Sequence, residues 1–270
     1  MLEKIIVFIF GSMIGSFLNV CIHRMPEGKS VVWPGSHCPK CSKRIPAYDN
    51  IPFLSYIILG GRCRFCKQRI PLRYPLVELL TALMFTALFF RYGLSYEFFY
   101  YIFFTGGLII ATFVDIKHRI IPDEISVGGV ILGFILSSVR GLSLQHKAYS
   151  FAPALNSLLG IVVGGAIIYL TGLLFDLVYF KLLKKPPIQG ETSSMGGGDV
   201  KLLAMVGAFL GWKYALLTFF LAPFFALIFG IINLISKKDH TLPYGPFLSL
   251  SAILSLFWFD RIINLLIFVK

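Results

Sequence analysis

The sequence predicts an all-α polytopic membrane protein of about eight transmembrane helices, with a small zinc-ribbon-like cytoplasmic insert between the first two. Three observations predict this fold class. Hydrophobic residues make up 57% of the 270 residues and charged residues only 14%, whereas roughly 45–50% of a soluble domain is apolar. Long apolar runs recur along the chain. Four of the five cysteines fall as two pairs in the one long polar segment.

The apolar runs give eight candidate spans, judged against the roughly 20 apolar residues that a helix needs to cross the hydrocarbon. The first is expected to be a retained helix and not a cleaved signal, because only Glu3 and Lys4 flank its start while basic residues follow its end. The eight candidates are 5–22, 74–90, 96–116, 124–139, 157–180, 199–212, 214–236 and 242–268.

The net charge of +12 is distributed unequally across these spans. In an eight-span arrangement, 18 of the 25 Lys and Arg residues fall on one side, and ten of them lie in 23–73. This positive-inside pattern assigns 23–73 to the cytoplasm. It explains the charge without a nucleic-acid partner, and we expect the basic face to contact anionic membrane lipid. The predicted organisation is a transmembrane helix (1–22), a cytoplasmic tetracysteine domain (23–73) and a transmembrane core (74–270).

The cytoplasmic segment contains HCPKC (37–41) and RCRFC (62–66). Two C-x2-C pairs offer the four thiolates that zinc binds in a tetrahedron, whereas two disulfides, the alternative, are disfavoured in a reducing cytoplasm. A structural zinc is expected, because a domain with few large apolar side chains needs such a staple. The stretch 51–60 is too short to span and is expected to be strand-like or buried. The predicted zinc ligands are Cys38, Cys41, Cys63 and Cys66.

Two acids are expected at the same depth, near the cytoplasmic margin of the bilayer. Asp115 closes a span that runs inward, and Asp199 opens a span that runs outward. An ionisable residue at such a position is costly and indicates a functional site. Two neighbouring carboxylates cannot both ionise easily, so one keeps a proton while the other acts as a base. Such a pair can activate water against a peptide carbonyl, and both aspartates are therefore predicted to be catalytic.

The residues around Asp199 suggest how a peptide would be held. Gly196, Gly197 and Gly198 precede it, and glycines allow unusual backbone conformations and close approach of an extended chain. Lys201, two residues beyond Asp199, is a further candidate substrate contact. These four residues are the predicted substrate-binding set.

Plainer interpretations of the same acids remain open at this point. Asp199 has the position of a helix N-cap, and Asp115 can pair with Lys117 or Arg119 as a solvated helix end. Glu78, inside the span 74–90, is a candidate cofactor-binding residue that would face a cationic group, or it satisfies a neighbour.

Taken together, the motifs resemble those of the prepilin peptidases, or type IV leader peptidases, among the GxGD-type intramembrane aspartic proteases. The resemblance implies catalytic roles for Asp115 and Asp199 and none for Asp123. The segments that carry it are GSFLNVCIHRMP (15–26), the tetracysteine stretch (37–66), RYPLVELL (73–80), DIKHRIIPDEIS (115–126), MGGGDVKLL (195–203) and YGPFL (244–248).

The resemblance also implies the substrates and the location. Substrates would be precursors of type IV pilins and of type II secretion pseudopilins, cut after a glycine that ends a short basic leader. Many members then N-methylate the new terminus with S-adenosylmethionine, an activity associated with the N-terminal cytoplasmic segment. The protein would lie in the bacterial cytoplasmic (inner) membrane, multi-pass, with its active site facing the cytoplasm. Asp123, Glu124 and Glu191 are candidates to receive the basic leader.

Two other functions are compatible with parts of the sequence. A transporter or channel can use intramembrane acids to relay protons or bind cations, and it can break helices at glycines. A relative of presenilin or of the archaeal preflagellin peptidases would share the chemistry but not the substrates. The tetracysteine insert argues against both of these relatives.

Overall fold

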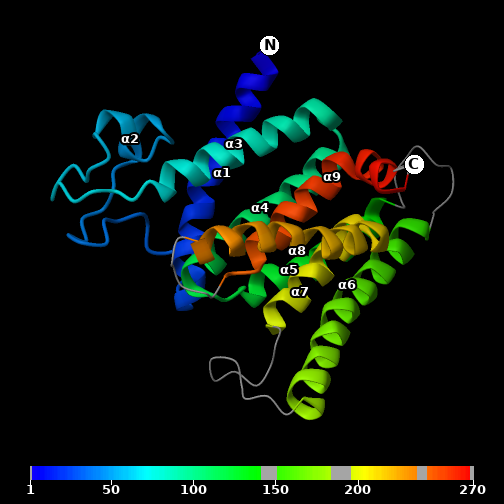
Figure 1. Cartoon of the computed structure of the whole chain (residues 1–270). Coiled ribbons are helices and arrows are strands. Elements are labelled where there is room, and N and C mark those ends of the chain that lie inside the picture. Colours follow the sequence, from blue (N-terminus) through cyan, green and yellow to red (C-terminus); the bar gives the residue numbers. More distant parts are fainter. Residues whose placement is uncertain (1, 141–150, 184–195, 236–241, 268–270) are drawn as a thin grey trace. The chain divides into compact units, whose positions relative to one another are not determined.

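The structure is a computed structural model that describes residues 2–140, 151–183, 196–235 and 242–267. Over these residues the chain forms helices and turns, with two isolated β-bridges and no β-strand (Figure 1). It divides into two compact units, Met1–Val114 and Asp115–Lys270. The predicted all-helical membrane architecture is confirmed. The domain boundaries predicted after residues 22 and 73 stay a prediction.

Six of the described helices are long and apolar enough to cross a membrane, and they match six of the eight candidate spans. The other two candidates form α5 (Asp123–Arg140) and α7 (Gly197–Leu210). α7 has 14 residues, or about 21 Å at 1.5 Å per residue, less than the ~30 Å of hydrocarbon. The six long helices are α1 (Leu2–Arg24), α3 (Arg73–Tyr92), α4 (Tyr96–His118), α6 (Ala152–Asp176), α8 (Trp212–Ile235) and α9 (Gly245–Ile267).

In the first unit, α1 packs closely against α3. Gly11 and Gly15 lie one turn apart on α1 and face the partner helix. A Cβ added at Gly15 would lie 2.7 Å from the Cα of Glu78, and one at Gly11 would lie 2.8 Å from the Cα of Ala82. Only glycine allows the two backbones to approach this closely. The contact holds Glu78 against the second half of α1.

The connection between α1 and α3 is compact and largely irregular. The prediction that 51–60 is strand-like or buried is wrong, because it contains the short helix α2 with Ile57 and Ile58 exposed at 73% and 68%. The Ser55 hydroxyl explains the turn: it accepts from the Ile51 amide at 3.1 Å and donates to the Tyr48 carbonyl at 3.0 Å. The helical pieces are 3₁₀ turns at Met25–Glu27 and Ala47–Asp49, and α2 at Leu54–Ile58.

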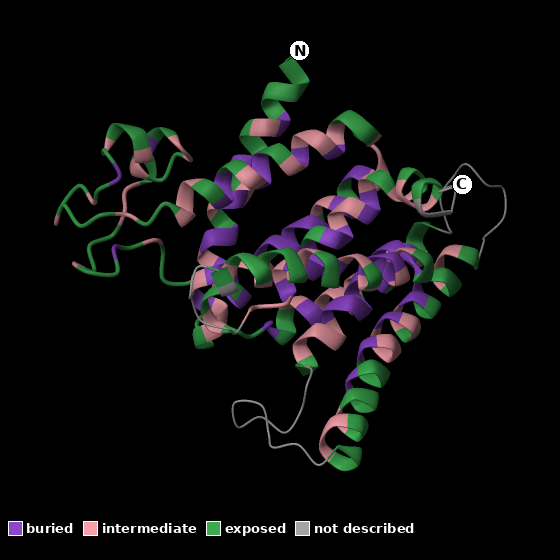
Figure 2. Ribbon diagram, viewed as in Figure 1, coloured by how far each residue is buried: buried purple, intermediate pink, exposed green. Residues whose placement is uncertain are grey.

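In the second unit, α7 packs against α5, α6, α8 and α9. Its residues Leu202–Leu210 are all buried (Figure 2), as expected for a helix that is apolar on every side. Gly160 of α6 and Gly207 of α7 lie so close that a Cβ on either would overlap the carbonyl of the other. The surrounding helices therefore hold α7, which carries Asp199 in its first turn.

The outer surface of α6 is suited to lipid. Its buried residues form one narrow stripe of mostly small side chains, whereas Leu158, Leu170 and Leu174 are exposed at 48%, 57% and 61%. α8 likewise exposes large apolar side chains. Together with the six long apolar helices, this makes the chain a multi-pass membrane protein.

Candidate active site and metal centre

Asp115 lies in the last turn of α4 and is only 6% exposed. Its Oδ2 accepts a hydrogen bond of 2.9 Å from the backbone N–H of Gly245, the first residue of α9. The first amides of a helix lack intrahelical acceptors and carry positive partial charge. The start of α9 is therefore a suitable place for a carboxylate. Arg119, just beyond the end of α4, adds an attractive charge.

Asp199 lies in the first turn of α7, 84 positions from Asp115 in the sequence. The two carboxyl groups lie near enough for their charges to act on each other, and the charge of Asp199 also acts on the hydroxyl of Tyr244. The N-cap residue of α7 is Gly196, and Asp199 is the third residue of the helix. The N-cap interpretation of this residue therefore has no support, whereas the two aspartates do lie near one another.

None of the three glycines before Asp199 has a positive φ, so their backbone angles are ones that other residues also adopt. What they contribute is the absence of side chains beside Asp199. Gly196 is extended and the other two begin α7. A Cβ at Gly198 would lie 3.2 Å from Ile121, whereas one at Gly197 would meet nothing within 4 Å. Gly197 is exposed, so the surface beside Asp199 is open to a ligand.

Lys201 makes an ion pair of 2.6 Å with Asp123, the first residue of α5. Both side chains are well exposed, at 43% and 64%. The ion pair occupies Asp123, one of the acids expected to receive a basic leader. Glu124 beside it is exposed, and Glu191 lies outside the described residues.

Two residues near the aspartates were not identified as site residues from the sequence. Tyr244 and Gly245 belong to YGPFL, which was noted only as a motif of the last helix. A glycine at a helix start, preceded by an aromatic residue, was the only local signal. The contact with Asp115 bridges 130 positions and depends on tertiary structure.

The two cysteine pairs form equivalent turns. Ser42 N–H donates to the Cys38 carbonyl at 2.9 Å, and Lys67 N–H donates to the Cys63 carbonyl at 3.0 Å. Both donors have positive φ, 55° and 58°. Each turn is closed by one β-bridge, and Lys40 Nζ donates to Gln68 Oε1 at 3.0 Å between the turns. The sequence C-x2-C thus folds twice in the same way.

The four thiols of these turns, one from each of the predicted zinc ligands, lie within 4.8 Å of one another. A tetrahedron with Zn–S bonds of about 2.3 Å has S···S edges of about 3.8 Å, and Cys38 Sγ lies 3.8 Å from Cys66 Sγ. The amides of Cys66 and Phe65 donate to Cys63 Sγ and lower the pKa of that thiol to about 7. The cysteines are free and not disulfide-bonded. Geometry and donor chemistry therefore fit a zinc ion.

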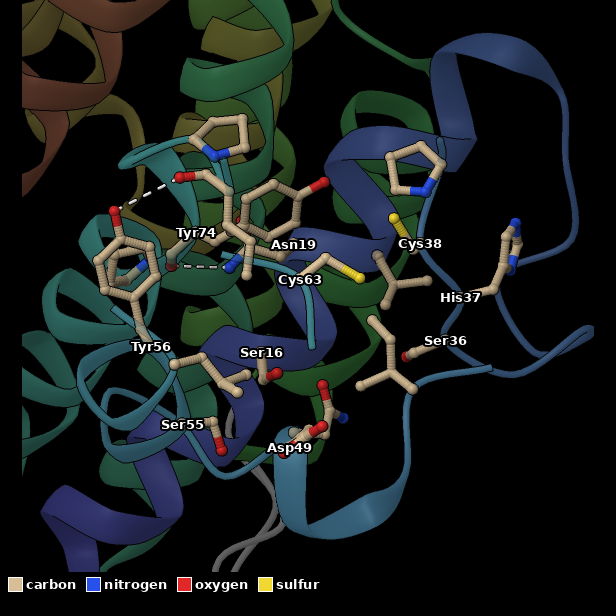
Figure 3. A pocket seen from close by; sticks show the side chains of 18 of the residues that line it. Ser16, Asn19, Ser36, His37, Cys38, Asp49, Ser55, Tyr56, Cys63 and Tyr74 are labelled. Carbon is tan, nitrogen blue, oxygen red and sulfur yellow. Dashed lines mark hydrogen bonds between the residues drawn. The ribbon is translucent and has the colours of Figure 1, made fainter. Parts of the chain in front are cut away.

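A cavity of about 310 Å³ lies in the first unit, between the end of α1, the connecting segment and the start of α3 (Figure 3). Asn19 Nδ2 donates to the Tyr74 carbonyl at 2.9 Å at its wall. Glu78 also lines it, is 9% exposed, and accepts a hydrogen bond of 3.1 Å from the Phe53 amide. The sequence-predicted residues thus form two groups, with Glu78 and the cysteines in one unit and the aspartates, glycines and Lys201 in the other.

Two family models match the chain. The model for the bacterial peptidase A24 N-terminal domain matches residues 9–92, and the model for the type IV leader peptidase family matches residues 102–231. The first range includes the cysteine turns and Glu78, and the second includes both aspartates. No solved structure matches the chain.

Curated relatives match over most of the chain. A protein of Pseudomonas aeruginosa is 32% identical over 94% of this chain and 90% of its own length. A protein of Aeromonas salmonicida is 33% identical over 95% of this chain and 91% of its own length. A protein of Myxococcus xanthus is 35% identical over 87% of this chain and 64% of its own length. All three carry the name prepilin leader peptidase/N-methyltransferase.

Proposed function

Because the chain belongs to the type IV leader peptidase family, we propose that it is a membrane-embedded aspartic endopeptidase. Its substrates are precursors of type IV pilins and pseudopilins, from which it removes the short basic leader. The enzyme class expected from the sequence is confirmed at the level of the family, and the transporter alternative has no support.

The observation that carries the mechanism is that Asp115 and Asp199, which come from distant parts of the sequence, both lie near the start of α9. The Gly245 amide donates to Asp115 at 2.9 Å, and the charge of Asp199 acts on the neighbouring residue Tyr244. One carboxylate takes a proton from water, and the other protonates the nitrogen that leaves the cleaved peptide bond. The Gly245 amide and the start of α9 suit Asp115 to the ionised role. We assign the proton to Asp199, because the amide of Gly245 donates to Asp115 and not to Asp199.

Substrate contacts are assigned to the open side of Asp199. Gly196, Gly197 and Gly198 would lie along the unwound peptide, an assignment that the exposed backbone at Gly197 supports. Lys201 would contact an acidic side chain of the mature part of the substrate, after exchanging its partner Asp123. Cleavage would take place on the cytoplasmic side of the bacterial inner membrane, where the basic segments face anionic lipid.

The test replaces each catalytic aspartate separately. Asp115→Asn and Asp199→Asn should each lower the cleavage of a purified pilin precursor in detergent by ~10²–10⁴-fold, the usual contribution of acid–base groups. Asp260→Asn, which changes an exposed aspartate of α9, is the matched control. Wild-type cleavage by either of the first two variants, at unchanged thermal stability, would refute the dyad.

We also assign a structural zinc ion to Cys38, Cys41, Cys63 and Cys66. The four-thiol cluster and the two equivalent turns support the assignment. Elemental analysis of purified protein should find about one zinc per chain, and the double variant Cys38→Ser/Cys63→Ser should lose it. Cys21→Ser, at a buried thiol of α1 outside the cluster, should keep it. Wild-type protein without stoichiometric metal would refute this assignment.

The second half of the relatives' name leads us to assign N-methylation of the new N-terminus to this chain, with S-adenosylmethionine as cofactor. When bound, S-adenosylmethionine supplies an electrophilic methyl group. Glu78 is the residue we assign to cofactor binding, because it is a buried acid in the wall of a cavity. Mass spectrometry of a processed pilin tests both activities, since it reports the cut site and any added methyl group.

A further inference from the structure

The short helix α2 presents an apolar face that the described part of the chain leaves uncovered. Leu54, Ile57 and Ile58 are exposed at 50%, 73% and 68% (Figure 2). Their spacing of i, i+3 and i+4 places them on one side of the helix, whereas Ser55, which lies off this side, is buried. A contiguous apolar patch on a protein surface marks a contact with another molecule or with a membrane.

Phe53, which directly precedes α2, fixes the level of this helix along α1. The Phe53 amide donates to Glu78 at 3.1 Å, and Glu78 lies against Gly15, nine residues before the end of α1. The ring centroids of Phe53 and Phe8 are 6.1 Å apart, and Phe8 lies sixteen residues before that end. At 1.5 Å per residue, these two levels are about 14 and 24 Å from the end of α1. Phe53 therefore lies beside the part of α1 that is inside the ~30 Å of hydrocarbon.

The attachment of α2 is specific, because Phe53 is held in an uncommon conformation. Its φ is 57°, in the left-handed region that bulky residues rarely adopt. Such a backbone persists only where surrounding contacts hold it. Here these contacts are the carboxylate of Glu78 on α3 and the ring of Phe8 on α1. All of these residues belong to the first unit.

The backbone at the start of α2 is hydrogen-bonded in the way that a lipid environment requires. No water is available in the hydrocarbon, so every backbone N–H there needs an acceptor within the protein. The Ile51 amide donates to the Ser55 hydroxyl at 3.1 Å, and the Phe53 amide donates to Glu78. Pro52, which lies between them, has no N–H. The amides that precede the helix are therefore satisfied by side chains and do not depend on water.

The surface of α2 continues a surface of α1 that faces lipid. Ile5 and Ile9, on either side of Phe8 in the sequence, are exposed at 50% and 52%. α1 is long and apolar enough to cross a membrane, so these side chains face acyl chains. The contact between Phe8 and Phe53 joins this surface to α2. Lipid is therefore the partner that fits the apolar face.

Basic residues follow α2 directly. Gly60 and Gly61 end the helix with positive φ, 59° and 66°, and the exposed Arg62, Lys67 and Arg69 come next. None of these three belongs to an ion pair among the residues that the structure describes. Long basic side chains reach the headgroup region from a buried backbone, and they attract anionic lipid.

We propose that α2 is inserted in one leaflet of the membrane beside α1, with its three apolar residues against acyl chains and the three cations that follow it against anionic headgroups. The apolar stretch 51–60 is too short to span but has the length of an interfacial or re-entrant segment. The cysteine turns then lie at the membrane surface, because Cys63 follows Ile58 by only five residues. This attachment is independent of the two proposed activities.

The test measures the depth of residue 57 by fluorescence, on the full-length protein in vesicles of phosphatidylglycerol and of phosphatidylcholine with brominated acyl chains. All three native tryptophans are first replaced by phenylalanine. Bromine quenches tryptophan on contact, so Ile57→Trp should lose most of its emission, as should Leu170→Trp on the exposed side of α6. Lys40→Trp, exposed in the first cysteine turn, should keep its emission. Emission of Ile57→Trp that is quenched no more than that of Lys40→Trp would overturn the insertion.

The lipid composition tests the basic residues. Vesicles that contain phosphatidylglycerol should quench Ile57→Trp more strongly than vesicles of brominated phosphatidylcholine alone. The triple replacement Arg62→Gln/Lys67→Gln/Arg69→Gln should abolish this difference. Equal quenching of Ile57→Trp in the two kinds of vesicle would overturn the assignment of these cations to anionic headgroups.

An alternative occupant of the apolar face is the apolar helix of a substrate. If brominated lipid leaves the emission of Ile57→Trp unchanged and a pilin precursor shifts it to shorter wavelength, the lipid contact is overturned. Thermal unfolding in detergent reports whether the variants fold. Should Ile57→Trp not fold, wild-type protein in vesicles is photolabelled with a lipid that carries a diazirine in its acyl chain. Label on Leu54, Ile57 or Ile58 supports the insertion, and label on α6 but not on α2 overturns it.

Discussion

The replacement Gly245→Ala tests how Asp115 is held. The Gly245 amide donates to Asp115 Oδ2 at 2.9 Å, and an added Cβ would lie 2.8 Å from the same oxygen and 3.3 Å from Cγ. Gly245 begins α9 and does not have a positive φ, so alanine fits the backbone. The effect of the added methyl group therefore falls on the carboxylate and not on the helix.

The size of the effect follows from that contact. Because 2.8 Å is closer than carbon and oxygen approach without a bond, the carboxylate must move by some tenths of an ångström and stretch its hydrogen bond. A hydrogen bond to a charged group contributes ~1.5–3 kcal/mol. At about 1.36 kcal/mol per tenfold in rate, its loss corresponds to a decrease of ~10–150-fold. We expect this decrease in kcat, with little change in KM.

The assay is cleavage of a purified pilin precursor at several concentrations, followed on a gel. Gly128→Ala is the matched control, because a Cβ there would meet nothing within 4 Å. Thermal unfolding should show that Gly245→Ala is at least as stable as wild type. A variant that folds and keeps the wild-type kcat would refute the role of this contact in positioning Asp115.

Three further predictions follow from contacts elsewhere. Lys201→Gln should raise KM several-fold, whereas Asp123→Asn, which removes the same ion pair but keeps the lysine, should not; equal effects would assign the defect to the ion pair. Gly160→Ala should lower the free energy of unfolding by ~1–3 kcal/mol through overpacking. Gly165→Ala is the control and should leave this free energy unchanged, because its Cβ would be 3.7 Å from its nearest neighbour. Equal unfolding free energies for the two variants would contradict the close packing of α6 on α7. Removing zinc with a chelator should speed proteolysis between residues 29 and 72, and an unchanged digest would argue against a structural metal.

Much of the fold could be predicted because its signals are local. Apolar runs of sufficient length gave the six long helices, and the spacing of the cysteines gave the cluster of thiols. Counting residues along the spans brought Asp115 and Asp199 to one depth, and the structure does bring them near each other. That agreement concerns placement only, and their catalytic role stays a proposal.

The rest depends on contacts between distant segments. The amide of Gly245 meets Asp115 across 130 positions, which no local pattern reports. The helix α2 forms where an apolar stretch suggested a strand, because the Ser55 hydroxyl closes the turn. Arg24 was counted only as one of the basic residues that set the topology, and its place in a cavity wall appears only in the folded chain.

The tight contact between Gly160 and Gly207 has a consequence for motion. α7 is buried from Leu202 to Leu210, and its Met205 and Phe209 lie against Gly129 and Gly133 of α5, so turning the helix about its axis would break these contacts as well. The helix can neither rotate nor slide without breaking that fit. Asp199 therefore behaves as an anchored end, and an incoming polypeptide has to adjust its own position to the carboxyl group of Asp199.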